Sequence, residues 1–133
     1  MMTQRQNISS GTVWEDIAGY SRAVRVGNLV FVSGTTATDA DGTLVGPDDP
    51  YAQTVFIIQK IERALREAGA SLGDVVRTRL FVADASQWEP VAKAHAEFFR
   101  EIRPANTLVE ISALVGEGYL VEMEADAVIQ DRP

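Results

Sequence analysis

Acidic side chains recur at every second position near the end of the chain, where they can carry out the chemistry of a carboxylate. Residues 103–128 read as two strands joined by a Gly-containing turn. Successive side chains of a strand point to opposite faces, so each strand has one apolar and one charged face. A carboxylate on such a face can orient a water molecule, accept a ligand N–H or pair with a cation. The predicted charged face consists of Glu110, Ser112, Glu122, Glu124 and Asp126, and the apolar face of Val109, Ile111, Ala113, Val121, Met123, Ala125 and Ala127.

Arg77 and Arg79 bring cations to the same sheet from another predicted strand, Val75–Val82. Opposite charges that face one another across strands contribute roughly 0.2–1 kcal/mol each. Two interpretations stay open: the face is solvated and its ion pairs contribute little, or a second subunit covers it and pairs some of these charges. Phe81 shares the face of the two arginines. It favours the covered interpretation, because a large apolar side chain would otherwise be exposed.

The elements that must position these side chains follow the order β-β-α-β-α-β-β. Residues 23–33 predict a hairpin with a two-residue Gly-Asn turn, after a short strand candidate at residues 7–9 in an otherwise polar segment. Apolar residues at helical spacing predict helices over residues 50–68 and 88–102. In the sequence, the first precedes the arginine-bearing strand and the second follows it. We therefore predict one α+β domain over residues 1–133, with two helices packed on one face of a mixed sheet.

Composition excludes several classes of function. The chain has 133 residues, no cysteine and one histidine, His95, so disulfides, thiolate metal sites and a cysteine nucleophile are excluded. A histidine-rich metal site is disfavoured, and His95 is expected to be a helix-surface or packing residue rather than a general base. The formal net charge of −7 argues against nucleic acid and anionic membranes as partners. No apolar run is long enough to span a bilayer and no signal-peptide core stands at the N-terminus, so a cytoplasmic location is expected.

Several short motifs follow one another at defined spacing. GYSRAV occupies residues 19–24, LVFVSG residues 29–34 and RTRLFVAD residues 77–84, after the first predicted helix. A Phe-Phe pair then precedes Arg-Pro-Ala, and VEMEA occupies residues 121–125. Each motif alone is weak, but their order and spacing resemble the RidA/YjgF family, also called the L-PSP endoribonuclease-like family, over residues 19–128.

The resemblance implies a chorismate-mutase-like fold and a homotrimer, with one site in each of the three clefts between subunits. Deaminating members of the family hydrolyse reactive enamines and imines formed from amino acids, and they release 2-keto acids and ammonia. An arginine grips the substrate carboxylate, because its planar fork matches a carboxylate. A water molecule, oriented by a glutamate, attacks the C=N carbon. The family chemistry needs no metal and no organic cofactor.

This chain departs from the family at the position of that arginine, where it has Asn106. An asparagine can donate two hydrogen bonds but carries no charge. Ala92 and Leu108 also replace the asparagine and the cysteine that are common in the family. The resemblance gives Glu122 and Tyr20 as the expected catalytic residues, and Ser33, Gly34, Asn106 and Thr107 as expected ligand-binding residues. Arg103 and Arg22 are expected to bind ligand as well, because their positions beside the cleft let either of them replace the missing cation.

Most of these residues also have structural interpretations, which stay open. Tyr20 can be a core or interface aromatic residue, and Glu122 can pair with an arginine on the sheet face. Arg103 can be a solvated residue, or it can replace the missing cation, as can Arg22. Trp14 can line the cleft or anchor the N-terminal segment.

Two classes of function follow from the resemblance. The first is a Rid-type hydrolase of an imine, an enamine or a related reactive metabolite, with little activity on simple 2-iminoacids because Asn106 replaces the arginine. The second is a non-catalytic trimer that binds a small metabolite in a regulatory or scavenging role. Endoribonuclease activity is a third and weaker alternative, because the chain is acidic and lacks a second histidine.

Overall fold

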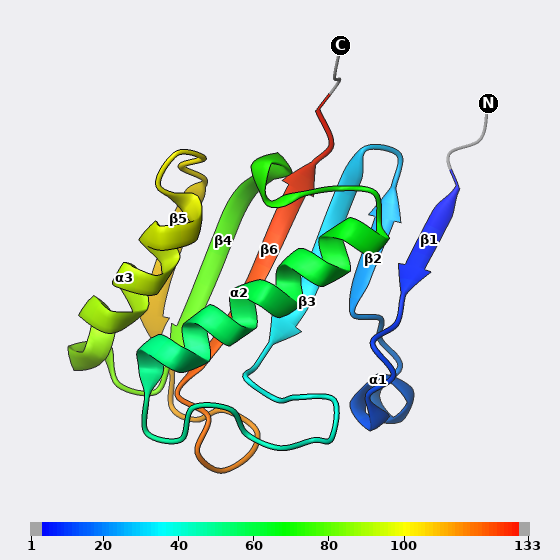
Figure 1. Cartoon of the computed structure of the whole chain (residues 1–133). Coiled ribbons are helices and arrows are strands. Elements are labelled where there is room, and N and C mark those ends of the chain that lie inside the picture. The colour runs from blue at the N-terminus through cyan, green and yellow to red at the C-terminus, as the bar shows by residue number, and fades with distance from the viewer. Residues whose placement is uncertain (1–3, 131–133) are drawn as a thin grey trace.

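One six-stranded sheet, covered on one face by two long helices, makes up the computed structural model, which describes residues 4–130 (Figure 1). The helices are α2 (Pro50–Glu67) and α3 (Trp88–Phe99), with a short α1 (Val13–Ala18) near the N-terminus. The strands are β1 (Arg5–Ile8), β2 (Ala23–Val26), β3 (Leu29–Thr35), β4 (Val75–Val82), β5 (Ala105–Glu110) and β6 (Val121–Val128). Two 3₁₀ turns, Leu72–Asp74 and Ala85–Gln87, precede β4 and α3.

The strands lie in the order β1-β2-β3-β6-β4-β5, and only β4 and β5 are parallel neighbours. The predicted class, α+β with two helices on one face of a mixed sheet, is confirmed. Two elements extend the predicted order. β1 overlaps the strand candidate predicted at residues 7–9, pairs with β2 and adds a sixth strand. α1 forms in the polar N-terminal segment and ends at Gly19, which has the left-handed conformation (φ 76°).

The two C-terminal strands form as predicted, but they are not joined by a simple turn. β4 lies between β5 and β6, parallel to the first and antiparallel to the second. Residues 111–120 therefore carry the chain past the end of β4 before β6 begins. The sequence could not reveal this crossover, because strand patterns do not specify which strands become neighbours.

The alternation predicted for β6 is confirmed, whereas the faces predicted for β5 were reversed. Val121, Met123, Ala125 and Ala127 are buried under the helices. On β5, however, Glu110 lies level with the buried Val82, and the backbone N–H of Ala85 donates to its Oε1 at 2.9 Å. Val109 lies instead beside Phe81 on the open face and is 41% exposed. On this edge strand Leu108, rather than Val109, packs against the core.

The core lies between the sheet and the two helices. Its largest fully buried side chains are Ile57, Ile58, Ile61 and Leu65 of α2, Val91 and Phe99 of α3, and Val30, Leu80, Val82, Val121 and Met123 of the strands. Asp49 caps α2, because its carboxylate accepts from the Ala52 N–H at 3.0 Å. Gln53 is buried and bonds to Gly46, Gly118 and Leu120, so it fixes two loops at the same end of the sheet.

The opposite face of the sheet carries both charge and exposed apolar surface. Arg79 Nη1 lies 3.1 Å from Glu124 Oε1 and 3.2 Å from Asp126 Oδ2, so the predicted pairing of cations with acids on this face is confirmed for Arg79. Arg77 forms no ion pair among residues 4–130. Phe31 lies opposite Asp126 in the sheet and is 47% exposed. Neither helix covers this face (Figure 1).

Candidate functional site

Five of the residues expected at the site come together where β2 begins and β3 ends. Tyr20 and Arg22 lie in the segment between α1 and β2, Ser33 and Gly34 belong to β3, and Glu122 is near the start of β6. The connection is local, because the Ser33 side chain donates to the Ser21 carbonyl at 2.7 Å. We call Tyr20, Arg22, Ser33, Gly34 and Glu122 the Gly34 cluster.

Arg22 holds this cluster together. Its Nη1 donates to the Gly34 carbonyl at 2.7 Å and to Thr35 Oγ1 at 2.9 Å, and its Nη2 donates to the Tyr20 hydroxyl at 3.3 Å. The guanidinium carbon also lies 5.6 Å from the centre of the Tyr20 ring. Both terminal nitrogens are therefore engaged within the chain, so Arg22 does not present a free fork to a ligand carboxylate.

A bulge in β3 brings Glu122 against the backbone. The register between β3 and β6 shifts between Val32 and Thr35, so Ser33 and Gly34 together oppose a single residue of β6. A Cβ at position 34 would overlap Oε2 of Glu122. Glycine thus allows the carboxylate of Glu122 to lie directly over the backbone at this position.

Glu122 is the carboxyl group of the cluster whose protonation is perturbed. Burial raises its pKa above the ordinary value, the positive charge of Arg22 opposes this effect, and the neighbouring Glu124 adds to it. The group is half-buried, so part of it stays accessible. A carboxylate with a raised pKa can accept a proton from water at a higher pH than a free glutamate can, which is what a general base for water attack requires.

The other expected site residues lie elsewhere on the chain. Arg103 is exposed and has a positive φ of 56° between α3 and β5. Asn106 and Thr107 lie on β5, the edge strand, and β4 separates them from β6. Thr107 faces the open side beside Arg79, in line with Glu124 across the sheet. Within one chain, therefore, these three residues do not border the Gly34 cluster.

Asn106 points toward the helices, away from the face of Glu122. Its Nδ2 donates to Thr78 Oγ1 at 2.9 Å, and Thr78 Oγ1 lies 2.9 Å from Nε2 of His95 on α3. Thr78 is fully buried. The Thr78 hydroxyl oxygen accepts from Asn106, so its hydrogen remains to be donated. The neighbouring acceptor for that hydrogen is Nε2 of His95.

His95 has the packing role expected from the sequence. Its ring lies 4.6 Å from that of Phe99, and burial lowers its pKa below 6.5. A neutral imidazole is the form that accepts from Thr78. The chain from Asn106 through Thr78 to His95 could not be found by sequence reasoning, because it joins three separate elements.

Two further expectations concern Trp14 and metal binding. Trp14 is 55% exposed on α1 and packs into no described core, so its position does not anchor the segment through burial. Among residues 4–130, no group of three or more His, Asp or Glu side chains is arranged to hold a metal ion. No helix within that range is long and apolar enough to cross a membrane.

Comparison with known proteins decides the family. The family model described as Endoribonuclease L-PSP matches residues 12–129. The chain belongs to this family. The family is also known as RidA/YjgF, so the resemblance in the sequence motifs is confirmed at the level of the family.

Relatives of this L-PSP family protein cover nearly its whole length. A crystal structure of a Mycobacterium tuberculosis member of the YjgF/YER057c/UK114 family has a TM-score of 0.87 and 48% identity, and the match covers 95% of this chain and 100% of that one. A Streptomyces coelicolor protein without an assigned function is 36% identical over 122 residues, 92% of this chain and 90% of its own. The 3-aminoacrylate deaminase RutC of Acinetobacter baylyi is 33% identical over 111 residues, 84% of this chain and 87% of its own.

Proposed function

We propose that this L-PSP family protein is a Rid-type hydrolase that acts on an imine, an enamine or a related reactive metabolite. The observation that carries the proposal is the Gly34 cluster, in which the half-buried carboxylate of Glu122 lies over Gly34 beside the Tyr20–Arg22 pair. The similarity to a 3-aminoacrylate deaminase supports the same reaction class. We expect the protein to act in the cytoplasm without a metal or an organic cofactor.

The proposed reaction is hydrolysis of a C=N bond. An enamine first becomes an imine by moving one proton from nitrogen to carbon. Glu122 orients a water molecule and accepts its proton as the oxygen attacks the imine carbon. The C=N π bond breaks in this step, and Glu122 returns the proton to the nitrogen, which gives a neutral tetrahedral adduct. Glu122 then takes the proton of the new hydroxyl group and passes it to the nitrogen, so the C–N bond breaks, the carbonyl forms and ammonia leaves. The products are a carbonyl compound and ammonia, and the atoms of one water are consumed.

The site is proposed to be completed by a second subunit. In one chain the Gly34 cluster and the β5 residues Asn106 and Thr107 lie apart across the sheet. The open face of that sheet exposes Phe31 and Val109 beside paired charges, as a face covered by another subunit would. A closed homotrimer would bury this face and bring β5 of one subunit to the Gly34 cluster of the next. Tyr20, Ser33, Gly34, Asn106, Thr107 and Glu122 would then bound the same cleft, with Arg103 at its margin.

The ligand of this cleft is proposed to be neutral or weakly polar at the position where the family arginine binds a carboxylate. Asn106 has no charge, and Arg22 is already bonded to Gly34, Thr35 and Tyr20. Simple 2-iminoacids are therefore expected to be poor substrates. The same feature favours the second candidate function, a non-catalytic trimer that binds a metabolite. An endoribonuclease is disfavoured by the net charge of −7.

One variant separates catalysis from binding. Imines and enamines of neutral and acidic amino acids, generated in place by an amino-acid oxidase, are supplied to the protein and ammonia release is measured. Glu122→Gln should abolish turnover of any substrate found, whereas Glu124→Gln, the same change two residues along β6, should retain it. Failure of the whole substrate panel, together with ligand binding that Glu122→Gln does not affect, would instead support the non-catalytic trimer.

A further inference from the structure

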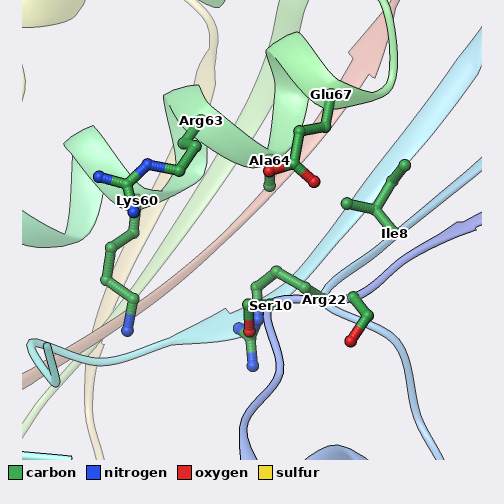
Figure 2. A pocket seen from close by; sticks show the side chains of 8 residues that line it. Ile8, Ser10, Arg22, Lys60, Arg63, Ala64 and Glu67 are labelled. Atoms are coloured by element: carbon green, nitrogen blue, oxygen red, sulfur yellow. The ribbon is translucent and has the colours of Figure 1, made fainter. Parts of the chain in front are cut away.

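A small cavity lies between α2 and the segment that leaves β1, apart from the carboxylate of Glu122. Its volume is about 50 Å³, room for a few water-sized groups. Figure 2 shows Lys60 extending from α2 and Arg63 lying along that helix, whereas Arg22 and Ser10 come from the strand side. The wall therefore combines three cations from two separate parts of the chain.

The three cations of this cavity form no ion pair with a carboxylate among residues 4–130, although the charges of Asp39 and Glu122 act on Lys60 and Arg22. The ion pairs of that range involve Arg66 and Arg79 only. Lys60 donates to the uncharged carbonyls of Thr36 and Thr38, at 2.8 and 2.9 Å. Burial and repulsion from Arg22 and Arg63 lower the pKa of Lys60 to about 8. This concentration of positive charge occurs in a chain whose formal net charge is −7.

Arg22 contributes a second, independent sign of a missing acceptor. It is 7% exposed, and its Nε is a buried donor with no hydrogen-bond partner among the described residues. Buried donors are nearly always satisfied in folded proteins, so such a group calls for an explanation. An acceptor in the cavity would supply the missing partner, because Arg22 forms part of the cavity wall.

The acidic groups nearby set the size and charge of a suitable ligand. Glu67 stands on the cavity wall but is exposed to solvent. Glu15 lies behind the serines and is already satisfied, because Ser9, Ser10 and Thr12 all donate to its carboxylate. Glu67 would repel a large polyanion, and the small volume excludes a nucleotide. A compact oxyanion is the class that satisfies both the cations and Arg22 Nε.

We propose that the cavity between Arg22, Lys60 and Arg63 binds a small oxyanion of the phosphate type. The anion would accept from the Arg22 Nε–H and from the cationic groups of Lys60 and Arg63. Free phosphate and the phosphate group of a small metabolite present the same oxygens, so both belong to this class of anion. The site is separate from the proposed hydrolytic cleft, but it shares Arg22 with it, since the terminal nitrogens of Arg22 hold Gly34 and Tyr20.

The experiment titrates the full chain with inorganic phosphate and measures the thermal midpoint and calorimetric affinity, with sodium chloride of equal ionic strength as the reference. Phosphate should raise the thermal midpoint more than chloride does. Arg63→Gln should weaken phosphate binding about tenfold, as expected for loss of one charge-assisted contact. Arg66→Gln is the matched control, since Arg66 lies on the same helix but outside the cavity. It should change the affinity less than about twofold.

A second variant keeps the test decisive if the first one perturbs the fold. Glu67→Gln removes the carboxylate of the cavity wall and should tighten phosphate binding by about two- to fivefold, through loss of like-charge repulsion. A damaged protein would not bind more tightly. Equal effects of phosphate and chloride, or equal weakening by Arg63→Gln and Arg66→Gln, would overturn the proposal, because both describe general screening of surface charge. Glycerol phosphate, tested in the same way, then distinguishes a free ion from a phosphate group on a metabolite.

Discussion

The carboxylate of Glu122 occupies the space that a side chain at Gly34 would fill. Gly34 does not need glycine for its backbone conformation, since it is not among the residues with positive φ. The close approach of Glu122 is therefore the reason that a glycine suits this position. A methyl group at residue 34 would displace the flexible end of Glu122 and leave the backbone as it is.

We predict that Gly34→Ala separates folding from activity. The variant should fold with a free energy of unfolding within about 1 kcal/mol of the parent, because the clash is with a movable side chain. Its turnover should fall by about 100-fold, the effect expected when a catalytic group is displaced by roughly 1 Å. Urea denaturation and ammonia release measure the two quantities. The control is Gly42→Ala, a change in a surface loop with open space around it. Gly42 has a positive φ, so alanine is more strained there than at residue 34. Unchanged turnover in Gly34→Ala would refute the role given to Glu122.

A second prediction concerns Asn106. Asn106→Arg should create measurable hydrolysis of 2-iminoacids, because the planar fork of arginine can bind the substrate carboxylate. The new side chain is free to do so, since arginine is too long to keep the bond to Thr78 and residue 106 is exposed at the sheet edge. A hydrogen bond to a charged group contributes roughly 1.5–3 kcal/mol, so the gain in kcat/KM should be about 10- to 100-fold. Asn106→Lys is the matched control, since it adds the same charge without the planar fork. An equal gain in both variants would show that charge alone, rather than bidentate binding, is sufficient.

The sequence predicted β6 and the two long helices well, because burial imposes a local period on each of them. β6 alternates along its whole length, since one face lies under the helices. β5 is different: it is an edge strand with weak burial, so its pattern did not distinguish Leu108 from Val109 as the core residue. α1 has only six residues, too few for a helical period to be recognised.

The candidate site was predicted as a set of residue types, but its internal bonds could not be predicted. Tyr20, Gly34 and Glu122 were found through family motifs, and they do lie together in the structure. The bonds of Arg22 to Gly34 and Thr35 depend on a bulge that has no sequence signature of its own. The cation-lined cavity joins the end of β1, the segment before β2 and α2, and no local pattern links Arg22 to Lys60.

His95 should make the stability of the protein depend on pH below neutrality. Burial lowers the pKa of His95 in the folded chain, whereas the unfolded chain keeps a value near 6.5. At a pH between these two pKa values, the unfolded chain therefore binds more protons than the folded chain. The free energy of unfolding therefore falls as the pH falls from about 6.5. Protonation would also remove the acceptor for the Thr78 hydroxyl.

The measurement for His95 compares urea midpoints at pH 7.5 and pH 5.5. The parent protein should lose more stability over this interval than His95→Gln, which cannot titrate. Other groups titrate equally in both proteins, so the difference isolates His95. If His95→Gln loses as much stability as the parent, the imidazole is not held neutral by the fold.

The last prediction tests the proposed homotrimer through its exposed sheet face. Phe31 is 47% exposed on the face that neither helix covers, opposite Asp126 in the sheet. Burying a phenylalanine at an interface contributes roughly 1.5–3 kcal/mol per subunit. A closed trimer buries three copies, so Phe31→Asp should dissociate it at micromolar concentration. Light scattering coupled to gel filtration should report a trimer for the parent and a monomer for the variant.

Trp88→Asp is the matched control for this prediction. Trp88 is similarly exposed, at 52%, but it begins α3 on the opposite side of the sheet. The control should therefore remain trimeric. Loss of assembly in both variants would point to unfolding rather than to a specific interface, and a monomeric parent would contradict the trimer itself. Because the proposed cleft joins Glu122 of one subunit to Asn106 of another, the monomeric Phe31→Asp variant should also lose turnover while keeping the Gly34 cluster intact.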